Sequence, residues 1–441
     1  MQLLRKHGHL AILLAAGLLL VVYACPGYMN YDAAEQLIQA RADWKSDGHP
    51  PIIVAYWQLF ELIVDGPFTL LILQVALFLY GAYTLLRLRF SRKAATWLTT
   101  GILLFPPMFT TLAVVWKDSQ MASFLLAGVA LALRPHRGAR TIGVFLLIIA
   151  AAVRYNAGAA LPTLVFLALT LAWRIRRVWL RIVIAFVFLA ATYFATSSIN
   201  WALANRHDHL WYRTTAVFDI VGIGCHSSVT SDEEFLTLLD GTALIQRKDL
   251  KHHFCRLFPP GTRDWFLHAE LFKWEVVRTE RLARKAAWKR MVLEYPGAWL
   301  KTRLLLAKDH LGLWEGVPLW EPVCQTFTGT YDQRQRLHIE SELSSLQQAM
   351  GDGFRWIATH TPLYRPWIYL VASLLLFGWA IWRRDLLVAS IVGSGLSYEL
   401  SILLVANSPD VRYAHWMITC TLFGLVFRYA KRTRLSEGSH D

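Results

Sequence analysis

The sequence predicts an all-α polytopic membrane protein, with about ten transmembrane helices and a mainly α-helical domain outside the membrane. The first reason is composition: 55% of the 441 residues are hydrophobic and 17% are charged, against about 25% charged residues in a typical soluble domain. The second is a series of apolar runs close to the roughly 20 residues that a helix needs to cross a bilayer. The third is a strong bias of Lys and Arg toward alternate loops.

Seven apolar runs form an N-terminal membrane module within residues 1–200. They cover about 10–25, 67–86, 94–114, 119–133, 141–153, 156–172 and 182–200. Pro26 follows Cys25, and the loop pattern closes only when the first run is retained, so we expect an uncleaved membrane helix rather than a signal peptide. The shorter apolar segment 52–64 contains Gln58 and Glu61, which favours a helix at the membrane interface.

Three further runs, about 364–382, 386–406 and 412–428, form a C-terminal membrane module within residues 363–441, which ends in a basic cytoplasmic tail. With the N-terminus inside, the inner segments hold 19 basic and three acidic residues, and the short outer segments hold five basic and eight acidic ones. An excess of Lys and Arg in cytoplasmic loops is the usual rule. The net charge of +14 therefore reflects topology and excludes nucleic acid as the expected partner.

The stretch 201–362 lies between the two modules, and its charges nearly balance, so we expect a soluble periplasmic domain there. Apolar residues recur at three- and four-residue steps over 264–312, interrupted at Pro296 and Gly297, which predicts two amphipathic helices. Cys225, Cys255 and Cys324 fall in this stretch. A disulfide among them fits an oxidising periplasm, but the spacing does not select the pair.

Charged side chains gather in four short turns on the predicted outer side. The first outer loop (26–66) carries acids near the end of the first helix, and the later turns each add an acid, a base or both. These candidates are Asp32, Glu35 and His49; Lys117 and Asp118; Arg154, Tyr155 and Asn156; and Asp410 and Arg412.

Each candidate also has a purely structural interpretation. Asp32 fits the N-cap of a helix with Glu35 at the third position. His49 precedes a Pro pair that starts a helix, and Lys117 with Asp118 would neutralise each other at the interface. Arg412 would anchor the last helix at headgroup level with Asp410 as its partner. Four consecutive turns with such residues nevertheless favour a common site.

Carboxylates beside fixed cations at a membrane interface suit a lipid-linked phosphate substrate. The cations would neutralise the leaving phosphate, and a carboxylate would take the proton from the attacking hydroxyl or amine. The pattern therefore predicts glycosyl transfer from a polyprenyl-phosphate sugar. Residues 222–224 (GIG) match neither a phosphate-binding loop nor a dinucleotide-binding pattern.

The order of these motifs resembles the GT-C superfamily of polytopic membrane glycosyltransferases, especially bacterial proteins similar to protein O-mannosyltransferases and to lipid A aminoarabinose transferases. The resemblance rests on YDAAEQ, HPP, WKDS, RYNA, PDVRY and the segment YPGAWLKTRLLL. It covers about 1–200 and 290–428, whereas 201–290 matches no family that we know. It implies a GT-C-like fold in the bacterial inner membrane, with the active site facing the periplasm.

The resemblance also implies roles for the candidates. Asp32 would be the catalytic base with Glu35 as a competing candidate, and Asp118 would be the second-loop acid. Lys117, Arg154 and Arg412 would hold the lipid-linked phosphate, and His49, Tyr155, Asn156 and Asp410 complete the candidate substrate-binding set. Metal dependence varies within the superfamily, so a divalent metal ion stays open and no cofactor is certain. His207 and His209 could bind a metal ion, but two histidines without further ligands are more often ordinary loop residues.

Two other functions stay open at this stage. A flippase for polyprenyl-linked sugars or a secondary transporter would carry polar residues near the middle of the membrane, where Glu399 is the clear carboxylate. A non-catalytic scaffold of an envelope complex would leave the four charged turns unexplained. The sequence does not identify the sugar, the glycan, lipid or protein acceptor, or the oligomeric state.

Overall fold

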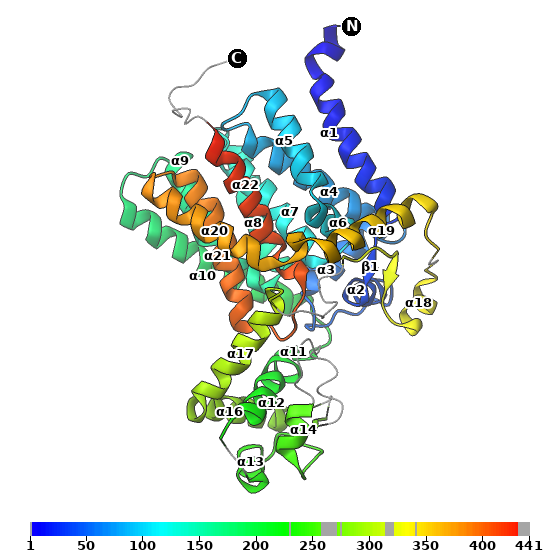
Figure 1. Ribbon diagram of the computed structural model, residues 1–441, viewed down its shortest axis with the longest axis vertical. Coiled ribbons are helices and arrows are strands. Elements are labelled where there is room, and N and C mark those ends of the chain that lie inside the picture. Colours follow the sequence, from blue (N-terminus) through cyan, green and yellow to red (C-terminus); the bar gives the residue numbers. More distant parts are fainter. Residues whose placement is uncertain are drawn as a thin grey trace.

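The computed structural model describes residues 2–228, 231–256, 271–273, 276–313, 322–339 and 342–430. These residues form helices and two strands of two residues each. The helices make a bundle and a smaller lobe that projects from one end of it (Figure 1). This confirms the all-α prediction.

The N-terminal part of the bundle follows the predicted apolar runs. Its helices are α1 (Gln2–Ala24), α4 (Phe68–Leu86), α5 (Arg92–Leu104), α6 (Pro106–Ala113), α7 (Lys117–Ala132), α8 (Arg137–Val153), η1 (Tyr155–Ala160), α9 (Leu161–Leu171) and α10 (Val178–Leu203). The single helix expected over 94–114 is divided into α5 and α6. The division falls at Phe105, whose extended backbone (ψ 124°) precedes Pro106, because a residue before proline avoids the helical conformation.

The C-terminal part adds α20 (Pro366–Trp382), α21 (Leu386–Val405), η4 (Val411–Ala414) and α22 (His415–Tyr429). Within the described residues, α4, α10 and α21 are long and apolar enough to cross a membrane. Gly8–Ala24, Tyr155–Leu171 and Pro366–Trp382 are shorter apolar helical segments. The chain thus has the helices of a membrane protein, and the number of ten crossings stays a prediction.

Helix α7 lies in close contact with α4 and α8, and glycines allow this approach. A Cβ added at Gly81 of α4 would lie 2.6 Å from the backbone nitrogen of Ala127, and one added at Gly143 of α8 would lie 2.4 Å from that of Ala132. Because α7 is buried along most of its length, the residues at its first turn are held by the packing of the whole bundle.

The small lobe consists of α11 (Leu210–Arg213), α12 (Thr215–His226), α13 (Asp232–Leu238), α14 (Leu250–Arg256), α16 (Arg278–Glu294) and α17 (Pro296–His310). Its core contains Val217, Phe235, Phe254 and Met291. Helices α16 and α17 match the two helices predicted within 264–312, and Pro296 begins the second. The second is not amphipathic as predicted, because Leu300 and Leu304 are exposed while Arg303 and His310 are buried. Residues 264–270 and 274–275 of that prediction lie outside the described residues.

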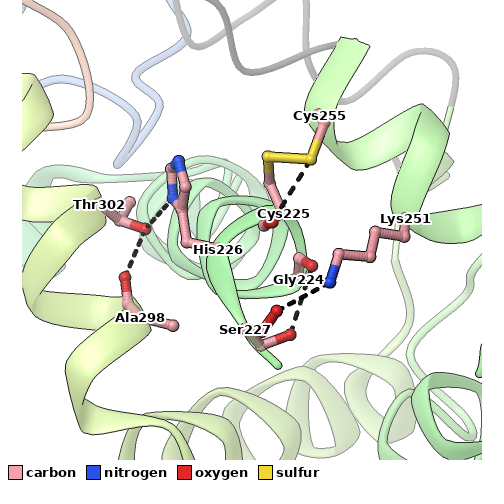
Figure 2. The surroundings of a disulfide bond; sticks show 8 residues. All are labelled: Gly224, Cys225, His226, Ser227, Lys251, Cys255, Ala298 and Thr302. Atoms are coloured by element: carbon pink, nitrogen blue, oxygen red, sulfur yellow. Dashed lines mark hydrogen bonds between the residues drawn. A yellow bond between two sulfur atoms is a disulfide. The ribbon is translucent and has the colours of Figure 1, made fainter. Parts of the chain in front are cut away.

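A disulfide joins Cys225 of α12 to Cys255 of α14 (Figure 2). Beside it, His226 is hydrogen-bonded to Thr302 of α17 at 3.1 Å. The pairing that the spacing left open is therefore Cys225 with Cys255, and Cys324 is buried elsewhere. The bridge links α12 to α14 through two cysteines that are 30 residues apart in the chain.

Residues after the small lobe return to the first loop. Strand β2 (Phe327–Thr328) pairs in parallel with β1 (Met29–Asn30), and α18 (Tyr331–Leu337) and α19 (Ser345–His360) follow. The side-chain amide of Gln347 donates to the carbonyl oxygens of Tyr23 and Cys25, at 3.0 and 3.2 Å. This segment therefore packs against α1 and the first loop, whose own helices are α2 (Tyr31–Arg41) and α3 (Pro51–Glu61).

Candidate functional site

The first loop is joined to the turn before α7 by backbone hydrogen bonds. The amide of Val115 donates to the carbonyl of Tyr28 at 2.8 Å, and the amide of Tyr28 donates to the carbonyl of Ala113 at 3.2 Å. These bonds place the start of α2 beside the start of α7. Each helix has an aspartate in its first turn, Asp32 and Asp118, where the helix dipole favours a carboxylate.

Asp32 is not the N-cap of its helix. Asn30 is the N-cap of α2, and its side-chain oxygen accepts a hydrogen bond from the amide of Ala33 at 3.1 Å. The interpretation of Asp32 as a capping residue is therefore wrong. Its carboxylate is directed to other partners.

Seven of the candidates come together in one group, which we call the charged cluster. Its members are Asp32, His49, Lys117, Asp118, Arg154, Asp410 and Arg412, contributed by the four turns that the sequence singled out. The first and the last of these turns are more than 300 residues apart in the sequence, so only folding brings these side chains together.

Asp32 contacts three members of the charged cluster. Its Oδ2 lies 3.0 Å from Nη2 of Arg412 and 3.6 Å from Nζ of Lys117, and its Oδ1 lies 3.8 Å from Nε2 of His49. Lys117 donates to Nδ1 of His49 at 3.0 Å. An ammonium can only donate, so Nδ1 of His49 accepts and the ring is neutral.

Asp118 forms the second acidic centre of the cluster and is completely buried. Its Oδ1 lies 3.3 Å from Nε of Arg154, and its Oδ2 lies 3.9 Å from Nε of Arg412. Neither oxygen has a hydrogen-bond partner among the described residues. Buried carboxylate oxygens that lack hydrogen bonds are costly and commonly mark a functional position.

Arg412 links all three carboxylates, because its Nε also lies 2.9 Å from Oδ2 of Asp410. Asp410 is its local partner, as the structural interpretation expected. Arg412 is nevertheless only 7% exposed, which differs from an anchor at headgroup level. Its Nη1 is buried and has no hydrogen-bond partner among the described residues.

Two aromatic residues that the sequence analysis did not select as site candidates hold the arginines. The guanidinium of Arg154 lies over the ring of Tyr413 at 4.7 Å, and that of Arg412 lies 5.2 Å from the same ring and 5.1 Å from that of Trp116. Such cation–π contacts orient a guanidinium without neutralising it. Both aromatics stand next to a charged candidate in the sequence, which is the signal that could have identified them.

The electrostatics of the charged cluster follow from burial and the three cations. Burial and the neighbouring Lys117 lower the pKa of His49 to about 3, so this ring is neutral near pH 7. Burial alone would raise the pKa of Asp32, but Lys117 and Arg412 outweigh it and lower that pKa below its ordinary value. Burial raises the pKa of Asp410 against the opposing effect of Arg412. Three cationic side chains thus face three carboxyl groups.

The remaining three candidates lie outside the cluster. Glu35 accepts from the amide of Gln39 at 3.4 Å and from that of Gln333 at 3.5 Å, so it faces α18. Tyr155 is 54% exposed, and its hydroxyl lies 3.5 Å from the carbonyl oxygen of Asp47. Asn156 is half-buried in η1, and within the described part of the chain no side-chain hydrogen bond is seen between it and the cluster.

The histidines considered as metal ligands lie at the junction of the first loop and α11. Nδ1 of His207 and Nδ1 of His209 lie 3.5 and 3.9 Å from Oδ2 of Asp47. Among the residues that the structure describes, no group of three or more His, Cys, Asp or Glu side chains is arranged to hold a metal ion.

With this geometry in view, the chain was compared with known proteins. No protein-family model and no curated protein matches the sequence. Among solved structures, ArnT from Cupriavidus metallidurans bound to undecaprenyl phosphate matches with 16% identity over 96% of this chain and 78% of that chain, at a TM-score of 0.34.

The mid-helix carboxylate Glu399 has a partner that the sequence did not reveal. Its Oε1 lies 2.8 Å from Nε2 of His310, the last residue of α17, and both side chains are almost completely buried. The polar residues of the charged cluster, in contrast, lie at helix ends and in turns. Sequence analysis missed His310 because it is distant from Glu399 in the chain and belongs to the small lobe.

Proposed function

We propose that this chain is a membrane glycosyltransferase that moves a sugar from a polyprenyl-phosphate donor to a glycan, lipid or protein acceptor at the periplasmic face of the bacterial inner membrane. The observation that carries the proposal is the convergence of Asp32, Asp118 and three cations from four turns. A buried group of carboxylates and cations at the ends of apolar helices suits a substrate whose phosphate lies at the membrane surface.

In the proposed reaction, the oxygen or nitrogen of the acceptor hydroxyl or amine attacks the anomeric carbon of the sugar. Asp32 accepts the proton that this oxygen or nitrogen loses. The bond between this carbon and the phosphate oxygen breaks, and polyprenyl phosphate leaves with the bonding electrons. Lys117, Arg154 and Arg412 stabilise the negative charge that develops on the phosphate. Asp118 holds Arg154 and Arg412 in place through its two oxygens.

The resting contacts of Asp32 suggest how the base becomes active. A carboxylate beside Lys117 and Arg412 is a weak proton acceptor, because the cations favour its ionised form. A donor phosphate competes for the same two cations. Once the phosphate has bound, Asp32 loses part of this stabilisation and becomes a stronger base, so the proposal requires the donor to bind before proton transfer.

Arg412 provides the test of phosphate binding. In Arg412→Lys the positive charge remains, but the planar guanidinium that can hold two phosphate oxygens is lost. We expect the affinity of the purified protein for polyprenyl phosphate to fall by about 1–3 kcal/mol. The matched control is Arg336→Lys on α18, since Arg336 is 62% exposed and pairs with Asp332. Wild-type affinity in Arg412→Lys would remove Arg412 from the phosphate site.

The transporter alternative depends on Glu399, because an unpaired carboxylate in the middle of a membrane helix would mark a transport path. Glu399 is paired with His310, and seven of the candidate charged residues lie at helix ends. These observations favour the transferase.

Comparing envelope glycans by mass spectrometry with and without the gene would identify the sugar and acceptor from the missing mass. An unchanged glycan profile would count against transfer.

A further inference from the structure

Helix α17 connects the small lobe to the bundle through two buried polar contacts. Figure 1 shows this helix leading from the lobe toward α21. Near its middle, Arg303 pairs with Asp219 of α12 at 2.7 Å and also donates to the carbonyl oxygen of Ala406 at the end of α21. At its end, His310 pairs with Glu399 of α21 at 2.8 Å.

The spacing of these contacts defines the packing. Arg303 and His310 are seven residues apart, which places them on one face of α17, two turns from each other. Their partners Ala406 and Glu399 are also seven residues apart, in the reverse order. The two helices therefore run antiparallel, and the contacts fix α17 against both sliding and rotation relative to α21.

The His310–Glu399 pair lies next to the charged cluster. The ring of His310 lies 6.2 Å from that of Tyr413, at an interplanar angle of 33°. Tyr413 in turn faces the guanidinium groups of Arg154 and Arg412. One aromatic ring therefore separates the end of the small lobe's last helix from the two arginines.

The His310–Glu399 pair also has hydrogen-bonding atoms without partners. Nδ1 of His310 and Oε2 of Glu399 have no hydrogen-bond partner among the described residues. Buried ionisable pairs often contribute little net stability compared with well-packed apolar residues. Ionisable residues inside a membrane helix more often serve function.

We propose that His310 and Glu399 are positioning residues for the phosphate-binding arginines, and that they connect the small lobe to that site. Through the contact with Tyr413, the pair fixes the ring over which Arg154 and Arg412 lie. This inference rests on the proposed function.

The test separates positioning from stability. The double variant His310→Phe with Glu399→Leu replaces the buried pair by apolar residues of similar size, so the protein is expected to keep or gain thermal stability. Its affinity for polyprenyl phosphate is expected to fall about tenfold. An effect of this size is typical when a residue acts on a binding site without contacting the ligand. Glu399→Gln retains an acceptor for His310, so it should keep an affinity closer to that of the wild type.

The matched control removes another buried pair of the bundle, one that lies far from the charged cluster. Arg89 and Asp385 pair at 2.6 Å at the opposite end of the helices. The double variant Arg89→Met with Asp385→Leu should leave phosphate affinity unchanged. Tyr413→Leu should reproduce the loss seen for the His310–Glu399 double variant, whereas Tyr413→Phe keeps the ring and should not.

The outcomes distinguish this inference from the proposed function. If the wild-type protein does not bind polyprenyl phosphate, the proposed function fails. If the wild type binds it and the His310–Glu399 double variant binds it equally well, the positioning role alone is overturned. A loss of affinity that only parallels a loss of thermal stability would likewise overturn it.

Discussion

His49 is the residue of the charged cluster whose ionisation has the clearest consequence for stability. Its pKa is about 3 in the folded protein, below the ordinary value of 6.5. Between these values the unfolded chain binds more protons than the folded one, so stability is lost as pH falls through this window. The contribution of a single such group is roughly 2 kcal/mol between pH 7 and pH 5.

The free energy of unfolding of both proteins should fall between pH 7 and pH 5. We therefore predict that this fall is about 2 kcal/mol smaller in His49→Gln than in the wild type. Denaturation of the detergent-solubilised protein at the two pH values measures this difference. His360→Gln is the control, because His360 is exposed on α19. An equal loss in wild type and His49→Gln would show that His49 is not held neutral by its surroundings.

At the residue scale, the sequence predicted the charged cluster better than its surroundings. Short turns limit where a side chain can lie, so Lys117, Arg154 and Arg412 could be assigned to one end of the bundle from topology alone. Glu35 was a competing base because it lies one helical turn from Asp32, and that spacing could not reveal that it faces α18. Tyr413 and His310 depend on contacts between distant segments, which no local pattern records.

At the scale of the elements, α7 is the helix on which the candidate site depends. It carries Lys117 and Asp118 in its first turn, and its position is set by backbone contact with its neighbours. A Cβ at Gly143 would lie 2.4 Å from the nitrogen of Ala132 and 2.7 Å from the carbonyl oxygen of Gly128. Backbone atoms cannot move aside as a flexible side chain does, so α7 and α8 would have to separate.

We predict that Gly143→Ala lowers stability by about 1–3 kcal/mol and reduces polyprenyl-phosphate binding, because α7 is displaced. Thermal unfolding and ligand titration of the same preparations measure both effects. Gly101→Ala is the control, since a Cβ there would meet no atom within 4 Å. Equal stability of the two variants would mean that the contact between α7 and α8 is looser than the structure indicates.

The sequence predicted elements well where hydrophobic length decides them, and less well where the backbone is interrupted. Every apolar run became helical, in one piece or in two, because a long apolar segment has no better way to satisfy its backbone. The break at Phe105 was missed, although Pro106 and Pro107 carry the signal for it. The partner of Cys225 could not be chosen from spacing, because a disulfide requires two side chains to meet in space.

For the whole molecule, the proposed reaction requires one membrane topology. The bias of basic residues predicts both termini inside and the small lobe outside. Cysteine accessibility or reporter fusions at about 90, 137, 178, 250 and 384 should identify position 250 alone as external. An internal position 250 would contradict the topology and would also place the charged cluster on the wrong face for a periplasmic acceptor.

The central claim is that Asp32 is the base of a sugar transfer from a polyprenyl-phosphate donor. Asp32→Asn keeps the size of the side chain but cannot accept the proton, so the rate should fall by roughly 10²-fold or more. Donor binding should survive, because the amide no longer competes with the phosphate for Lys117 and Arg412. Asp65→Asn, in an exposed position of the same loop, is the control and should keep wild-type activity.

The measurement is the release of polyprenyl phosphate from a polyprenyl-phosphate sugar by the purified wild type, Asp32→Asn, Glu35→Gln and Asp65→Asn in lipid vesicles. We expect release by the wild type, Glu35→Gln and Asp65→Asn, and almost none by Asp32→Asn. An active Asp32→Asn with an inactive Glu35→Gln would assign the base to the other carboxylate. Two results would contradict the transferase mechanism. One is wild-type release by both Asp32→Asn and Glu35→Gln, and the other is no release by the wild type with donors and acceptors of the envelope.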